Sequence, residues 1–259
     1  MGHVRVGRLP KRFGWQHVVA ALTSAESTDR QVVQTAAAAA HRALSQAKYQ
    51  ESLAHCYWLF VTIADASRRQ SFVAELRDIG ISRPEGNSGV ALISAVSDFA
   101  NSRVRGRRAT TALDEIALQT FQSVVTNTVA QESQTLFGCT VDTVQAAFRR
   151  ISTKAKVASL GRRFFSEYTY RALRYALERE LANSLASDAL FQDSDDLTQF
   201  HGRLRSYCWD VSKIVEEYSG GWYSKRAWER RLTLSDAQGF TSYAVQKLLS
   251  ELSSEEGFP

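Results

Sequence analysis

Apolar residues recur at intervals of three and four through most of this chain, and that spacing places them along one face of an α-helix. The clearest example lies within residues 111–136, in a run that contains Leu113, Ile116, Ala117, Phe121, Val124, Val125 and Val129. Only 3 of the 259 residues are proline, too few for the turns of a many-stranded sheet. The pattern predicts an all-α protein, a multi-helix globular bundle of roughly eight to ten helices.

Residues 53–67 are apolar nearly all round rather than on one face. A helix of that kind has no side to offer to water, so we expect it at the centre of the bundle. Two short runs, 57–63 and 90–96, also fit buried strands, because periodicity alone does not separate a buried strand from a buried helix. An α/β fold is therefore the alternative to the bundle.

Local residue types predict several helix boundaries. Ser88 is placed to cap the helix that follows it, and Thr111 with Asp114 has the spacing of a capping box. Gly161 is expected to break or kink a helix, because the apolar stripe changes face there. The pair Gly220-Gly221 is expected to form a loop between two C-terminal helices.

The basic stretch 101–110 is where we expect the chain to divide. It would separate an N-terminal helical lobe, residues 1–105, from a C-terminal helical lobe, residues 106–259. A single domain is the alternative.

The cysteines and the apolar runs indicate a compartment. Cys56, Cys139 and Cys208 are odd in number and far apart, which argues against a disulfide framework and for a reducing, cytoplasmic location. The longest apolar stretch, residues 53–66, has 14 residues, whereas a membrane span needs about 20. We therefore expect no membrane partner.

Positive charge is carried mainly by arginine, which supplies 25 of the 32 basic residues against 27 acidic ones. The planar guanidinium donates two parallel hydrogen bonds and so suits phosphate. No acid lies between Asp142 and Glu167, and Arg149, Lys156 and Arg163 fall on one face of a single predicted helix. A second acid-free cluster holds Arg103, Arg105, Arg107 and Arg108, and a third holds Arg5, Arg8, Lys11 and Arg12.

These clusters predict contacts with the phosphate backbone of nucleic acid. The residues expected to make them are Arg103, Arg105, Arg107, Arg108, Arg149, Arg150, Lys154, Lys156, Arg163, Lys225 and Arg226. The hypothesis requires that residues 103–108 and 149–163 form one continuous positive surface. The alternative is a set of separate solvated faces that happen to be basic.

The C-terminal region offers two further hypotheses. The Gly220-Gly221 loop would present Trp222 and Tyr223 for stacking on a base or for a protein partner, unless these aromatic rings pack inward. Residues 234–245 faintly match a helix-turn-helix around Gly239. The competing interpretation of that segment is one helix, capped by Thr233 and Asp236 and packed through Ala237, Phe240, Ala244, Leu248 and Leu252.

No catalytic or cofactor motif is present. The five histidines lack metal-ligand spacing, no glycine-rich loop precedes a Walker lysine, and no dinucleotide fingerprint occurs. We therefore expect no catalytic residue, no bound metal and no cofactor. The sequence predicts a non-catalytic helical subunit of a larger assembly that contacts nucleic acid and other protein subunits. A protein–protein scaffold without nucleic acid is the second hypothesis, favoured by the uncharged Gln and Thr face at 119–134, and an enzyme with a dispersed site is the third.

Overall fold

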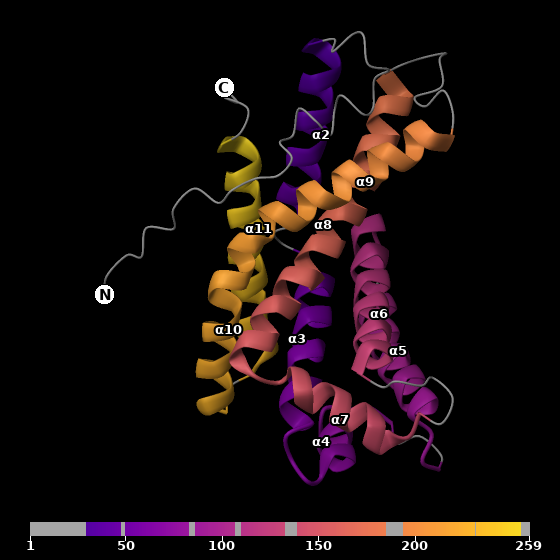
Figure 1. The fold of residues 1–259 in the computed structure, drawn as a ribbon, viewed down its shortest axis with the longest axis vertical. Helices are drawn as coiled ribbons and strands as arrows, with labels where there is room; N and C mark the ends of the chain where they lie inside the picture. Colours follow the sequence, from indigo (N-terminus) through magenta and orange to yellow (C-terminus); the bar gives the residue numbers. More distant parts are fainter. Residues whose placement is uncertain are drawn as a thin grey trace, which may run out of the picture.

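The computed structural model describes residues 30–47, 50–82, 86–106, 110–132, 139–184, 194–230 and 232–254. Within these ranges the chain forms ten helices and no strand, with a single isolated bridge between Ser88 and Thr140. The helices are α2 (Arg30–Ala47), α3 (Glu51–Ala66), α4 (Phe72–Asp78), α5 (Gly89–Arg105), α6 (Ala112–Glu132), α7 (Val141–Ile151), α8 (Lys154–Ser184), α9 (Ser194–Val211), α10 (Lys213–Trp228) and α11 (Leu234–Ser254). The predicted all-α bundle is confirmed (Figure 1).

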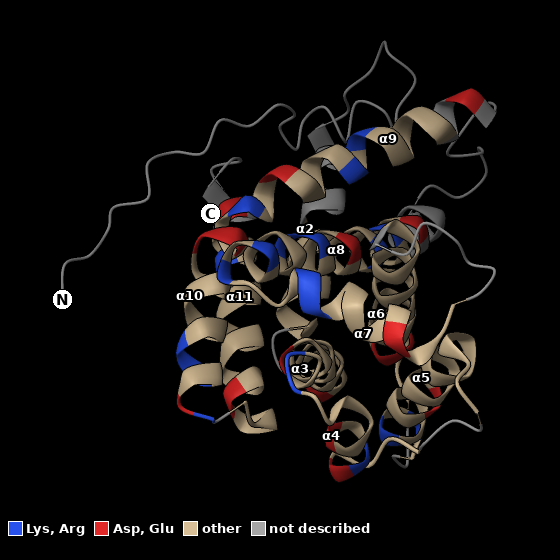
Figure 2. Ribbon diagram, turned by 60° about the horizontal axis from the view of Figure 1, so that its bottom comes forward, with Lys and Arg blue, Asp and Glu red and all other residues tan. Residues whose placement is uncertain are grey.

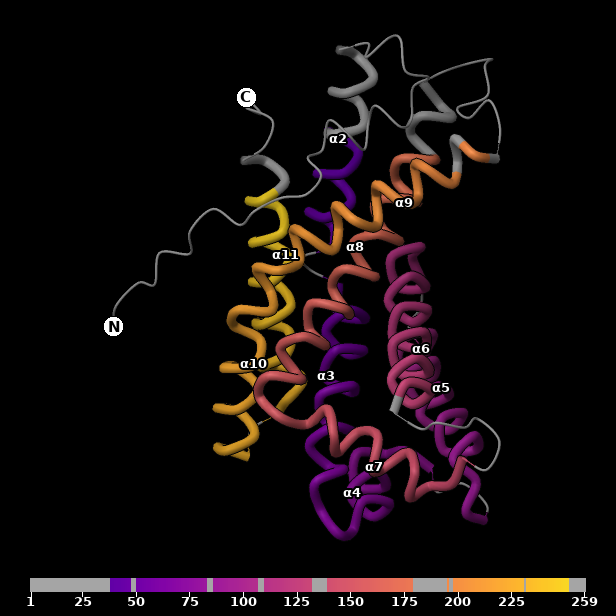
Figure 3. The backbone as a smooth tube through the Cα atoms, viewed as in Figure 1, coloured from indigo at the N-terminus to yellow at the C-terminus, as the bar shows by residue number. Residues whose placement is uncertain are grey.

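The α/β alternative is wrong, because both apolar runs that raised it are helical. Residues 57–63 belong to α3 and residues 90–96 to α5. Burial on several sides accounts for their composition, since α3 packs against α5, α6, α7 and α11. It lies between α10 and α11 on one side and α5 and α6 on the other (Figure 3). The prediction of a buried central helix is confirmed.

Two of the contacts of the central helix are with the last helix and with the residues just before it. The Tyr57 ring, 1% exposed, stacks on Phe240 with centroids 5.0 Å apart and planes 10° apart. The neighbouring Trp58 donates its indole N–H to the Leu232 carbonyl at 2.8 Å. The apolar face of α11 thus completes the core around α3.

The predicted helix caps are present. The Ser88 hydroxyl accepts a hydrogen bond from Ala91 N at 3.2 Å. Thr111 and Asp114 exchange the two bonds of a capping box, with Thr111 N donating to the Asp114 carboxylate at 2.7 Å and Asp114 N donating to the Thr111 hydroxyl at 3.3 Å. These bonds use backbone N–H groups that have no partner inside the helix.

The predicted helix break at Gly161 is wrong. The chain breaks earlier, at Ser152 and Thr153, and α8 runs without interruption through Gly161. A side chain at Gly161 would bring its Cβ within 2.8 Å of the Ser219 hydroxyl on α10. Glycine is therefore needed here for close helix packing and not for a turn.

The predicted Gly220-Gly221 loop is also wrong, because both glycines lie within α10. A Cβ at Gly220 would meet the Lys154 carbonyl and stand 3.1 Å from the Ala158 Cβ on α8, whereas a Cβ at Gly221 would meet nothing within 4 Å. The absence of a side chain at Gly220 lets α10 lie directly against the first turn of α8.

The helix-turn-helix hypothesis fails, because α11 continues unbroken from Leu234 to Ser254 through Gly239. Its start is capped as the competing interpretation predicts, with Asp236 N donating to the Thr233 hydroxyl at 3.1 Å. Ala237, Phe240, Ala244 and Leu248 form its buried stripe.

Helices from both expected lobes share contacts. α2 packs against α8 and α11, and α3 packs against α6 and α11. The division at residue 105 stays a prediction. None of the helices in the described ranges combines the length and apolarity that crossing a bilayer requires.

Candidate functional site

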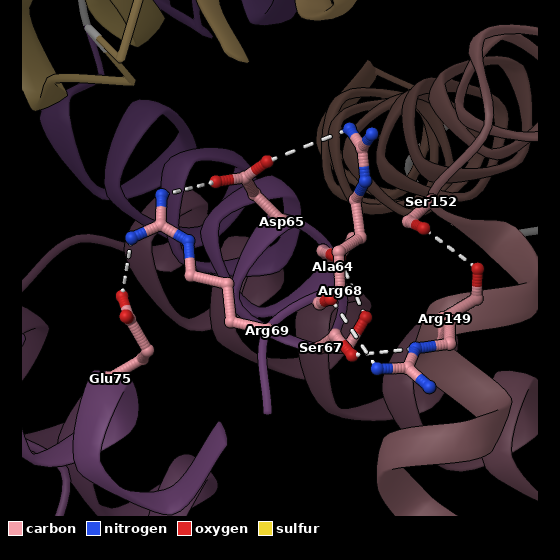
Figure 4. Close-up of polar contacts among 8 residues, drawn as sticks. All are labelled: Ala64, Asp65, Ser67, Arg68, Arg69, Glu75, Arg149 and Ser152. Carbon is pink, nitrogen blue, oxygen red and sulfur yellow. Dashed lines mark hydrogen bonds and ion pairs between the residues drawn. The ribbon is translucent and has the colours of Figure 1, made fainter. Parts of the chain in front are cut away.

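The predicted basic stripe does not form on one helix. Arg149 lies in the last turn of α7, whereas Lys156 and Arg163 lie on α8, beyond the break at Ser152. Arg149 is engaged by the end of α3, where its Nε donates to the Ser67 carbonyl at 3.1 Å and its second nitrogen to the Arg68 carbonyl at 3.3 Å (Figure 4). This arginine stabilises the fold by satisfying carbonyls at a helix end.

In the second cluster, the two arginines that the structure describes also contact neighbouring side chains. Arg105 pairs with Glu115 at 2.8 Å, and the hydrogen bond from that carboxylate raises the pKa of the guanidinium. The Arg103 guanidinium lies 5.3 Å from the centre of the Phe99 ring. Arg107 and Arg108 lie outside the described residues, as do Arg5, Arg8, Lys11 and Arg12.

The two clusters sit at opposite ends of α3. Ser52, near its start, bonds to Asp114, the neighbour of the residue that holds Arg105. Arg149 binds Ser67, at its other end. A helix of this length spans about 24 Å, so Arg105 and Arg149 lie far apart, and a continuous surface from 103–108 to 149–163 stays a prediction. Lys and Arg are interspersed with Asp and Glu over the ribbon (Figure 2).

The aromatic residues near the glycine pair pack inward. Trp222 lies half-buried against Phe240, with ring centroids 4.5 Å apart, and Tyr223 is 1% exposed. The expected loop is therefore a packed helix that buries Tyr223, and stacking of a base or a protein partner on these rings stays a prediction. Arg226 pairs with Glu229 at 3.0 Å and with Asp236 at 3.2 Å, and Lys225 is exposed.

A different set of residues does converge on one cavity, which we name the basic pocket. Its volume is about 720 Å³, and it lies where the end of α3, the α7–α8 junction and the end of α10 meet. Four cations and one carboxylate line it: Arg68, Arg69, Lys154, Arg230 and Asp65. Of these cations, the sequence had pointed only to Lys154.

The charges in the basic pocket are unevenly compensated. Arg69 is held by Asp65 at 3.3 Å and by Glu75 at 2.9 Å, whereas Arg68 stands 3.9 Å from Asp65 (Figure 4). Lys154 and Arg230 form no ion pair with any described residue. The pocket therefore keeps an excess of positive charge that an anion can neutralise.

The arrangement at two helix ends also favours an anion in the basic pocket. α8 begins at the pocket with no acidic residue in its first turn, so the positive end of its dipole is uncompensated. The carbonyls at the end of α3 would oppose an anion, but Gln145 and Arg149 of α7 donate to them. Gln145 bonds to the Ser67 and Arg69 carbonyls at 3.1 and 2.8 Å.

Tyr223 supplies a buried donor to the pocket wall. Its hydroxyl is sealed from bulk solvent and makes no well-formed hydrogen bond with the described residues. Burial, reinforced by Asp65, raises the pKa of Tyr223 to about 12, although nearby Arg68 opposes the rise. The hydroxyl stays protonated at neutral pH and can donate to an anion.

Trp228 and Arg230 complete the rim. Trp228 is 89% exposed, far more than the other large apolar side chains in the described ranges. Arg230 has a φ of 50°, a left-handed conformation that normally favours glycine and that costs a non-glycine residue about 1–2 kcal/mol. Arg230 thus occupies the position after the C-cap of α10, where helices often end in this conformation, and Trp228 stands beside it at the rim.

Sequence reasoning missed Arg68 and Arg69, and it did not single out Trp228 or Arg230 as site residues. The Trp-Glu-Arg run at 228–230 was a signal, because it places an aromatic ring and a cation at a helix end. No cluster of three or more potential metal ligands occurs among the described residues. Comparison of the chain with protein-family models, with curated proteins and with solved structures found no match.

Proposed function

We propose that this protein is a non-catalytic helical subunit that contacts nucleic acid, and that the basic pocket is the place of contact. The observation that carries the proposal is the cavity with four cations against one carboxylate, entered beside the first turn of α8. A phosphate would occupy the pocket between Lys154 and Arg230, and the exposed Trp228 ring would stack on an adjacent base.

This arrangement favours single strands. The pocket is a hollow about the size of a small-ligand site, not a long stripe that follows a duplex, and a base can reach Trp228 only when it is unpaired. A protein–protein scaffold is the second candidate function, since an exposed tryptophan beside arginines is also typical of interface hot spots. The two differ in salt dependence, which is steep for phosphate contacts.

The test is fluorescence anisotropy of labelled single-stranded RNA, single-stranded DNA and duplex DNA with the full chain, between about 50 and 200 mM salt. We expect single strands to bind more tightly than duplex. Each phosphate contact adds about −0.7 to the slope of log affinity against log salt for a single strand. Trp228→Ala should weaken binding by about 1–3 kcal/mol and leave that slope unchanged.

Arg230→Gly provides a variant whose failure to bind cannot be blamed on unfolding. It removes one cation and relieves the left-handed strain, so the free energy of unfolding should stay the same or rise by up to about 1 kcal/mol. The slope of log affinity against log salt should become less steep by the contribution of about one phosphate contact.

Arg103→Met is the matched control, because it removes an exposed cation at the far end of α3 without touching the pocket. Equal weakening by Arg103→Met and Arg230→Gly would disprove the pocket as the site of contact. Absence of salt-dependent binding to every probe would disprove the nucleic-acid proposal itself and favour the scaffold.

A further inference from the structure

Two hollows follow each other along the line where α6 packs on α8. The upper hollow has a volume of about 410 Å³ and is walled by α6, α8 and α9. The lower hollow, of about 150 Å³, lies between α6, α8 and the end of α7. Arg163 lines both of them and so lies where the two hollows adjoin, and we name the two hollows together the α6–α8 groove.

The upper hollow offers unused hydrogen-bonding groups. Four uncharged polar side chains from three helices face it, and none of them bonds to another described residue: Ser123, Asn127, Ser166 and Ser206. Ser166 is only 7% exposed, so the hollow supplies most of its surroundings. An amide and three hydroxyls can donate and accept at once, as the edge of a nucleobase and a ribose require.

An aromatic surface lies in the same hollow. Trp209 is 40% exposed, and Arg162 fixes it by stacking 4.0 Å from its ring centre and by donating to its carbonyl at 3.1 Å. The Glu167 carboxylate is taken up by Arg171 at 2.8 Å and Arg205 at 3.0 Å. Asp210 is the second acid of this hollow, and Arg163 and Arg205 are its two cations, so its charges balance and an uncharged planar group is the best match.

The lower hollow has the opposite character. Lys156 and Arg163 line it, and no acidic residue does. The Thr128 hydroxyl is buried in its wall, on a residue 2% exposed, and has no hydrogen-bond partner. Arg163 presently donates to the Gln131 amide oxygen at 2.7 Å. Two cations and an unsatisfied hydroxyl in so small a space fit one phosphate group.

The spacing of the two hollows fits a single molecule. Ser166 in the upper hollow and Ser159 in the lower one lie seven positions apart on α8, which corresponds to about 10 Å along the helix. That is comparable with the length of a nucleotide from base to phosphate. Arg163, between them, is placed to reach the phosphate from the shared wall.

We propose that the α6–α8 groove binds a nucleoside monophosphate, with the base on Trp209 and Asn127 and the phosphate between Lys156 and Arg163. This site does not depend on the basic pocket, since no residue lines both.

The test is isothermal titration of the full chain with AMP, GMP, CMP and UMP, and with the nucleoside and inorganic phosphate alone. At least one nucleotide should bind on the order of tenfold or more tightly than its nucleoside, because the phosphate adds charge-assisted hydrogen bonds. Lys156→Met should remove most of that advantage and leave nucleoside binding unchanged. Trp209→Ala should weaken nucleoside and nucleotide alike. Thr128→Val, which keeps the shape of the side chain, should weaken only the nucleotide.

The control variants lie in the basic pocket. Trp228→Ala and Lys154→Met should leave nucleotide binding unchanged, and both should weaken binding to single-stranded nucleic acid, so the two proposals fail separately. The groove proposal is overturned if no nucleotide binds, if nucleotide and nucleoside bind equally, or if inorganic phosphate binds as tightly as the nucleotide. Loss of nucleotide binding in Trp228→Ala but not in Trp209→Ala would overturn it as well.

Discussion

The Ser52 hydroxyl at the start of α3 donates a 2.5 Å hydrogen bond to the Asp114 carboxylate at the start of α6, 62 positions away in the chain. The same carboxylate also accepts from the Thr111 backbone N–H at 2.7 Å and from the Thr111 hydroxyl at 2.8 Å. Asp114 is only 6% exposed, so one buried side chain both caps its own helix and joins it to the central one.

Asp114→Ala should therefore lower the free energy of unfolding by about 2–4 kcal/mol, because it removes a cap and leaves the Ser52 hydroxyl buried without this acceptor. Urea denaturation followed by circular dichroism measures the change. Glu115→Ala is the control, since its exposed pair with Arg105 is screened by solvent and should contribute much less. An equal loss in the two variants would contradict the role assigned to Asp114.

Adjacent glycines in α10 should respond in opposite ways. Gly220→Ala places a methyl group against the Lys154 carbonyl and should destabilise the protein by about 1–3 kcal/mol. Gly221→Ala meets open space within the same helix and should stabilise it by about 0.5–1 kcal/mol. Thermal unfolding of the two variants measures both changes. Two shifts of the same sign would show that α10 does not lie against α8 as described.

Arg149 should stabilise the protein through the planar geometry of its guanidinium as well as through its charge. Arg149→Met removes two charge-assisted bonds to the end of α3 and should cost about 1–3 kcal/mol. Arg149→Lys keeps the charge but lacks the planar fork, so it should recover only part of the loss. Chemical denaturation compares the three proteins. Lys156→Met, which removes an exposed cation with no bond to the described fold, should change stability by less than about 0.5 kcal/mol.

Stability should depend on pH through His201. Burial, with Arg174 next in importance, lowers the pKa of this histidine, whose ring nitrogen lies 3.2 Å from the Tyr170 hydroxyl. The unfolded chain therefore binds a proton more readily than the folded one, and stability falls as the pH drops below about 6.5 and through the lower folded pKa.

His201→Gln should remove this acid-side loss, so its melting temperature should fall less than that of the natural sequence between about pH 7.5 and 5. Differential scanning calorimetry across that range measures the difference. His41→Gln, at an exposed position on α2, is the control. A parallel decline in all three proteins would assign the acid sensitivity to other groups.

The parts of the fold that the sequence predicted are those that depend on near neighbours. Caps such as Ser88 and Thr111 act on N–H groups three residues away, and α3 is apolar on all sides because helices cover it all round. Gly161 and Gly220 misled the prediction because their reason lies on another helix, where Ser219 and Lys154 leave no room for a side chain. The spacing of residues in the sequence does not show how closely two helices approach each other.

The basic pocket could not be predicted from the sequence for the same reason. Its cations come from residues 68–69, 154 and 230, and only tertiary packing brings these segments together. Conversely, arginines that looked available in the sequence are taken up by the fold, as Arg149 is by Ser67 and Arg105 by Glu115. An acid-free stretch indicates where positive charge is concentrated in the sequence. It does not indicate which carbonyl and carboxylate groups will bind these arginines in the folded protein.

The contacts of Tyr57 with Phe240 and of Trp58 with Leu232 bear on how the protein is made. Synthesis must proceed about 170 residues beyond the central helix before these partners exist, so α3 is made long before the residues that cover it. During that interval the aromatic surface of α3 is exposed to solvent. In a chain that ends before α11, this surface would stay exposed. Chaperone demand and losses to proteolysis should accordingly fall most heavily on prematurely terminated chains.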